Sequence, residues 1–156
     1  MQTTQRTPAV MAWLGYAGTL PFLGLAAAMW AVPGWQSWLH PALLEYGALI
    51  LSFVGALHAG MAIAGLAQEQ PALQARMHAW SVVPCLLGWL ALLLPVNWGT
   101  ALLVLGFAAH WAQDWRLARR TGLPRGYLGL RARLSLIACL SLAAAALAVP
   151  LVYGAA

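Results

Sequence analysis

Two histidines and one aspartate lie inside stretches that are apolar enough to cross a membrane. His58 ends the motif YGALILSFVGALH, and His110 precedes Asp114 by four residues in a later stretch. Residues at positions i and i+4 share one face of an α-helix, so the Asp114 carboxylate is expected to accept a hydrogen bond from the His110 imidazole. Because ionisable side chains are costly inside a bilayer, these three residues are candidates for a functional site.

A structural role is the alternative for each of these residues. His58 could donate one hydrogen bond to a neighbouring helix and so hold two helices together. Asp114 could pair with an arginine at the membrane interface while His110 extends its ring toward water. The sequence leaves both interpretations open.

The composition indicates an integral membrane protein. Hydrophobic residues make up 63% of the 156 residues, charged residues make up only 7%, and the mean hydropathy is +0.77. A chain of this composition cannot surround one core with a polar surface. Cys85 and Cys139 lack the spacing of metal ligands, and we interpret both as packing residues rather than as a disulfide or a zinc site.

Five apolar stretches predict an all-α fold, in which residues 1–156 form one domain, a bundle of five transmembrane helices. We place the spans at about residues 10–32, 43–66, 78–94, 97–115 and 134–152. Pro21 lies in the middle of the first span and predicts a kink, because proline removes a backbone hydrogen bond. That span is longer than the apolar core of a signal peptide and is expected to remain a helix. Residues 95–97 leave room only for a tight turn, which predicts a hairpin of spans three and four.

The arginines predict the orientation of the chain. All eight basic residues are arginine, and a five-span topology places them on one side of the membrane. They are Arg6, Arg76, Arg116, Arg119, Arg120, Arg125, Arg131 and Arg133. By the positive-inside rule, the N-terminus is predicted in the cytoplasm and the C-terminus in the periplasm, with the chain in a bacterial inner membrane. The same distribution favours contacts with anionic lipids, and we expect no nucleic-acid partner.

The predicted topology brings the candidate residues together. Spans two and four both run from the outer to the inner side, and a rise of about 1.5 Å per residue puts His58 and His110 at similar depths. We therefore predict a cluster of His58, His110 and Asp114 in the inner leaflet, capped by arginines of the loop between residues 116 and 133.

Small residues accompany His58 along the second span. Ala56 and Gly60, and then Gly60 and Ala64, repeat at the four-residue spacing that lets helix backbones approach closely. Gly47 and Gly55 fall broadly on the same side as His58 at about 100° per residue. This pattern predicts that His58 points into a tight helix interface and away from lipid.

Several motifs together resemble a known family. They are YGALILSFVGALHAG in the second span, SVVPCLLGWLALLL in the third, an aspartate near the end of the fourth, and LPRGYLGLRARLS before the fifth. Over roughly residues 10–150 the chain resembles an uncharacterised bacterial family that is similar to eukaryotic transmembrane protein 69. The resemblance implies a multi-pass membrane fold and supplies no activity. The motif positions that it implies are Tyr46, Ser52, His58, Pro84, Trp89, Asp114, Pro124, Tyr127 and Arg131.

The first functional hypothesis is a binding or accessory protein of the inner membrane. The inner-leaflet cluster would hold a lipid-soluble ligand, such as a quinone or a lipid, or a partner helix, and Arg131 would meet its anionic or carbonyl end. Membership of a larger membrane complex, or a homo-oligomer, is compatible with this hypothesis. The predicted ligand-binding residues are Tyr46, Ser52, His58, His110, Asp114 and Arg131.

Two alternatives use the same residues differently. In the first, His58 and His110 are the axial ligands of a haem b in a redox protein. In the second, His110 and Asp114 relay protons in a small proton-coupled transporter. Enzyme activity is not favoured, because no serine or cysteine has a recognisable base nearby. We expect no resident cofactor or metal, with quinone and haem b as the alternatives.

Overall fold

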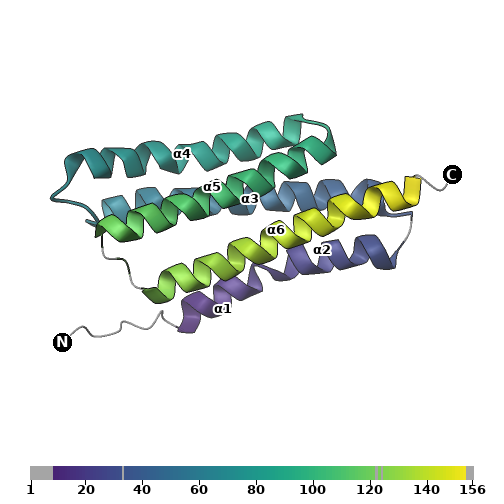
Figure 1. Cartoon of the computed structure of the whole chain (residues 1–156), viewed down its shortest axis with the longest axis horizontal. Helices are drawn as coiled ribbons and strands as arrows, with labels where there is room; N and C mark the ends of the chain where they lie inside the picture. Colours follow the sequence, from purple (N-terminus) through teal and green to yellow (C-terminus); the bar gives the residue numbers. More distant parts are fainter. Residues whose placement is uncertain (1–8, 33, 122, 124, 154–156) are drawn as a thin grey trace.

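The computed structural model describes residues 9–32, 34–121, 123 and 125–153, and within those residues the chain is helical without strands (Figure 1). The predicted all-α membrane fold is therefore confirmed. The helices are α1 (Ala9–Ala17), α2 (Leu20–Ala31), α3 (Gln36–Ile63), α4 (Pro71–Leu93), α5 (Val96–Thr121) and α6 (Arg125–Tyr153).

Among the described residues, four stretches are long and apolar enough to cross a membrane. They are Ala9–Ala31, Gln36–Ile63, Pro71–Leu93 and Gly126–Ala148. The remaining predicted span, the fourth at residues 97–115, corresponds to α5, which has 26 residues but is less apolar because it carries His110, Gln113 and Asp114. α5 packs against α3, α4 and α6, and both His110 and Asp114 are buried. Its polar side chains thus face the bundle, as ionisable groups inside membranes usually do.

The helices start earlier than the spans predicted from hydropathy. α3 begins at Gln36, α4 at Pro71 and α6 at Arg125, so most of the loop predicted between residues 116 and 133 is helical. Hydropathy marks only the apolar part of a helix, whereas arginine, leucine and alanine all favour helix at the ends as well. Arg131, predicted to lie in a loop, therefore lies on the second turn of α6.

The predicted kink at Pro21 is a break between α1 and α2. The helix stops at Ala17 and resumes at Leu20, which puts Pro21 in the first turn of α2, where its missing N–H costs no hydrogen bond. The Tyr46 hydroxyl donates to the Gly18 carbonyl across 2.8 Å and so satisfies a backbone group freed by the break.

α3 is the central helix and contacts α2, α4, α5 and α6. Gly55 lets it approach α4, since a Cβ at this position would lie 2.8 Å from the ring of Pro84. The prediction that the Ala56, Gly60 and Ala64 repeat forms the interface is wrong: all three residues are exposed, and no atom lies within 4 Å of a Cβ placed on Gly60. They lie on the opposite face of α3 from Gly55 and His58, because each residue rotates the helix by about 100°.

α3 ends in a Schellman motif beside the candidate cluster. Gly65 has a positive φ of 92°, its N–H donates to the Ala62 carbonyl, and the Leu66 N–H donates to the Met61 carbonyl. The predicted hairpin of α4 and α5 is present, with α4 ending at Leu93 and α5 starting at Val96. Figure 1 shows the start of α1, the α3–α4 connection, the end of α5 and the start of α6 at one end of the bundle, opposite the end of α6.

Candidate functional site

Asp114 is the centre of a buried charged cluster near the arginine-rich end of the bundle. It lies on α5 with 0% of its surface exposed. The Arg131 Nε, on α6, donates to the Asp114 Oδ2 across 2.9 Å. Because Arg131 is itself buried, the two opposite charges form an ion pair shielded from water.

His58 from α3 and His110 from α5 complete this cluster. Their Nε2 atoms lie 3.5 Å and 3.8 Å from the second carboxylate oxygen, Asp114 Oδ1. The two rings contact each other edge to face, with 4.9 Å between their centroids. The structure thus brings together four of the six predicted site residues, His58, His110, Asp114 and Arg131, and their role in binding stays a prediction.

Trp80 on α4 is a member of the cluster that the sequence motifs do not predict. Its indole Nε1 donates to the His110 Nδ1 across 3.1 Å, and the two rings stack 14° from parallel. Trp80 and His110 lie 15 residues on either side of Pro95, and residues equally far from a tight turn face each other in a hairpin. That symmetry is the signal that could have found this contact.

Tyr46 and Ser52, the other two predicted site residues, do not join the cluster. They precede His58 on α3 by 12 and 6 residues, which corresponds to about 18 Å and 9 Å along the helix axis. Tyr46 instead caps the Gly18 carbonyl and packs edge-on against Phe22, and Ser52 donates to the Ala48 carbonyl in its own helix. Both have local structural roles in this geometry.

Several buried polar atoms of the cluster have no hydrogen-bond partner among the described residues. They are both ring nitrogens of His58, the Nε2 of His110, the Oδ1 of Asp114 and the Nη2 of Arg131. Buried polar groups are normally paired, because desolvation without a hydrogen bond is costly. The cluster therefore holds more donors and acceptors than its own contacts satisfy.

The cluster fits neither a metal ion nor a haem well. Ligand atoms of His58, His110 and Asp114 lie within 4.8 Å of one another, but Arg131 already neutralises the carboxylate. Because the His110 Nδ1 accepts from Trp80, the proton of a neutral ring is assigned to Nε2, the atom that would have to bind the metal. A haem between His58 and His110 would need to separate rings that are in contact.

A large apolar groove includes Arg131 in its lining. It has a volume of about 640 Å³ and is lined by residues of α1, α2, α3, α5 and α6, among them Leu14, Ile50, Phe107 and Leu134. Leu14 and Phe53, two of the lining residues, are exposed at 69% and 64% on the outside of the bundle. The groove is thus accessible from the side that lipid would cover, and Arg131 is the charged residue in its lining.

Comparison with known proteins gives a family and no activity. A family model described as a protein of unknown function, DUF3429, matches residues 7–147. Transmembrane protein 69 of Xenopus tropicalis is 34% identical over 131 residues, which are 83% of this chain and 51% of that protein. The chain thus spans about half the length of this curated relative. No solved structure matches the chain.

Proposed function

We infer the function of this chain, which belongs to the DUF3429 family and is a multi-pass membrane protein, from the geometry of its own groove and cluster. We propose that it binds a lipid-soluble ligand that has an apolar chain and a carbonyl oxygen, of which a quinone is the best match. The apolar chain would lie in the groove, and the carbonyl would accept a hydrogen bond from Arg131. The protein would act as a binding or accessory protein rather than as an enzyme.

The observation that carries this proposal is that Arg131, whose Nη2 has no hydrogen-bond partner among the described residues, belongs to the lining of the groove. The side chain of Arg131 is 7% exposed, and its Nε is already engaged by Asp114, so Nη2 is a buried donor without an acceptor. The volume of about 640 Å³ falls within the range of small-molecule sites. Besides Arg131, the lining holds the hydroxyls of Thr19 and Ser135, and its other side chains are apolar. Such a groove suits a ligand with a polar acceptor group on an apolar body.

The charge balance of the cluster favours a carbonyl over a phosphate in the groove. Asp114 is the buried acid beside Arg131, and their charges cancel at a distance of 2.9 Å. An anionic headgroup at Arg131 would compete with Asp114 for the guanidinium and leave an excess negative charge in an apolar setting. A neutral carbonyl would use the free N–H and leave the ion pair intact.

Binding of decylubiquinone tests the proposal. The matched variants are Ile50→Trp, which enlarges a residue in the groove lining, and Leu49→Trp, its exposed neighbour on α3. We expect titration of the delipidated protein to show binding that Ile50→Trp weakens at least about tenfold and Leu49→Trp leaves unchanged, because only the first occupies the ligand volume. Mass spectrometry of a solvent extract should find quinone in the protein as isolated. An extract with phospholipid alone, together with no decylubiquinone binding, would overturn the proposal.

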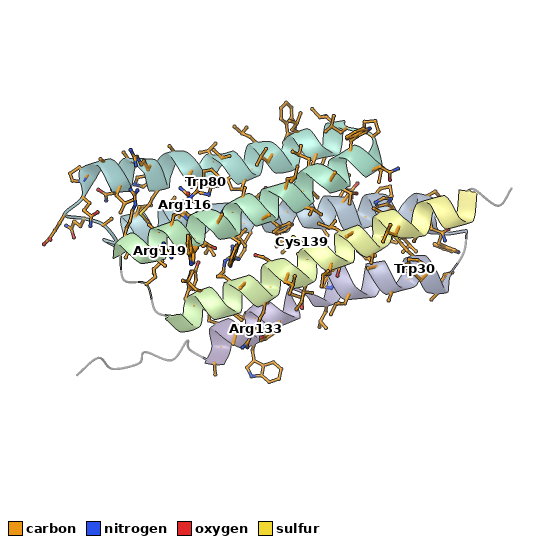
Figure 2. All side chains as sticks on the ribbon, in the orientation of Figure 1. Trp30, Trp80, Arg116, Arg119, Arg133 and Cys139 are labelled. Carbon is orange, nitrogen blue, oxygen red and sulfur yellow. The ribbon has the colours of Figure 1, made fainter. Side chains whose placement is uncertain are left out.

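The arginine-rich end of the bundle would face the cytoplasm of a bacterium. This orientation rests on Arg76, near the start of α4, and on Arg116 and Arg119, near the end of α5 (Figure 2). In a variant with both native cysteines replaced, a membrane-impermeant thiol reagent added to intact cells should label Asn97→Cys, in the first turn of α5, and not Gln68→Cys, in the α3–α4 connection. The reverse labelling pattern would show the opposite orientation.

A further inference from the structure

A second, smaller cavity lies next to the charged cluster, on the side away from the groove. It has a volume of about 130 Å³, and His58 is the residue of the cluster that lines it. The walls come from α4 and α5, and they include Arg76, Arg116 and Arg120 together with Gln113. The groove has one charged residue in its lining, whereas this cavity has three arginines.

The three arginines make the cavity strongly positive. Arg116 and Arg120 are four residues apart on one face of α5, an arrangement in which like charges repel each other, and Arg76 faces the same space from α4. The salt bridges among the described residues all involve Asp114, and none involves these three arginines. Their charges are therefore balanced by no carboxylate in that part of the chain.

His58 provides an independent indication of a ligand. It is 1% exposed and lines the cavity, and its Nδ1 has no hydrogen-bond partner in the described part of the protein. Its other ring nitrogen is directed to Asp114, whose charge is already paired with Arg131. A doubly protonated ring, with Nε2–H toward Asp114, would donate from Nδ1 to an anion in the cavity. The anion would also separate the three positive charges of the arginines.

We propose that this cavity binds a phosphate-class oxyanion, held by Arg76, Arg116 and Arg120 and reached from within by His58. Guanidinium groups match the oxygen spacing of phosphate in paired hydrogen bonds. A volume of about 130 Å³ holds about four water molecules at roughly 30 Å³ each, which suits a single phosphate group and excludes a nucleotide. The group could be free phosphate or the headgroup phosphate of a lipid. This site is separate from the groove, so its test does not depend on quinone binding.

A pair of matched variants tests the site. Arg116→Gln combined with Arg120→Gln removes two lining charges, whereas Arg119→Gln removes a neighbouring charge that lies over the Trp115 ring, outside the cavity lining. Figure 2 shows Arg116 and Arg119 close together on α5, which makes them suitable for comparison. The first measurement is the unfolding midpoint of the detergent-purified protein in potassium phosphate, compared with the midpoint in potassium chloride at equal ionic strength. The second measurement is native mass spectrometry of the protein with phosphatidylglycerol.

We expect phosphate to raise the unfolding midpoint of the wild type and of Arg119→Gln, with the apparent affinity at least about tenfold weaker in the double variant. If phosphate has no effect but phosphatidylglycerol is retained by the wild type and by Arg119→Gln and lost from the double variant, the phosphate group belongs to a lipid. Either result supports the site. Equal responses of the double variant and Arg119→Gln to both probes would overturn it. A phosphate response no larger than that to chloride would also overturn it if the double variant retained phosphatidylglycerol as well as the wild type does.

Discussion

Asp114→Asn is expected to lower the free energy of unfolding by about 3–5 kcal/mol, the range observed when one partner of a buried ion pair is removed. Asparagine keeps the shape of the side chain and an acceptor oxygen, so the lost quantity is the negative charge opposite Arg131. The guanidinium would then remain buried without a counter-charge. Reversible unfolding of the detergent-solubilised protein by increasing denaturant measures the change.

Glu45→Gln is the matched control for this variant. It makes the same acid-to-amide change on α3, but Glu45 is exposed, so we expect a change within about 0.5 kcal/mol. If Asp114→Asn and Glu45→Gln alter the free energy of unfolding equally, the buried ion pair does not hold α5 to α6.

Replacing both partners should separate stability from binding. A double variant, Asp114→Leu with Arg131→Met, leaves no buried charge behind, and apolar replacements of a whole buried ion pair are often neutral. We expect it to recover most of the stability that Asp114→Asn loses. We also expect its affinity for decylubiquinone to fall at least about tenfold, because the Nη2 donor is gone while the groove keeps its apolar lining.

The two measurements on this double variant have distinct meanings. Recovered stability with unchanged decylubiquinone binding would show that Arg131 is a structural residue and that the ligand is held elsewhere. A double variant as unstable as Asp114→Asn would instead show that unpaired charge is not the reason for the instability. Only recovered stability with lost binding supports both the ion pair and the role of Arg131 in the groove.

The cluster lies between two cavities of different chemistry. Arg131 is in the lining of the apolar groove, and His58 is in the lining of the arginine-rich cavity. Asp114 contacts both residues. A ligand in one cavity could thus alter the environment of the other through a single carboxylate, and the variants at Asp114 bear on both proposals.

The polar residues within the helices could be chosen from the sequence because hydropathy is a local property. His58, His110 and Asp114 can be recognised without knowledge of the fold, because an ionisable group in an apolar stretch is costly at any rotation of the helix. The four-residue spacing of His110 and Asp114 likewise puts them on one face without any tertiary information. The clustering of arginines at one end follows from the order of the helices alone.

The partners across helices could not be chosen in the same way. Hydropathy predicts a loop at Arg131, because the apolar part of α6 begins later in the chain than the helix itself. The helix extends back to Arg125, and this extension turns the Arg131 side chain toward Asp114. Asp114 lies nine residues before Leu123, and Arg131 lies eight residues after it. This nearly equal separation predicts a contact only when the segments on both sides of Leu123 are known to be helical.

Composition and hydrophobic periodicity predict a helical membrane bundle with ionisable residues inside it, because both are properties of single helical segments and need no knowledge of their packing. Arg131 also belonged to the site predicted from the sequence, but its pairing with Asp114, the contact of Trp80 with His110 and the absence of Tyr46 and Ser52 from the cluster follow from the three-dimensional packing. The physical reason is that each residue turns a helix by about 100°, so contacts between helices depend on where each helix begins and how it is rotated.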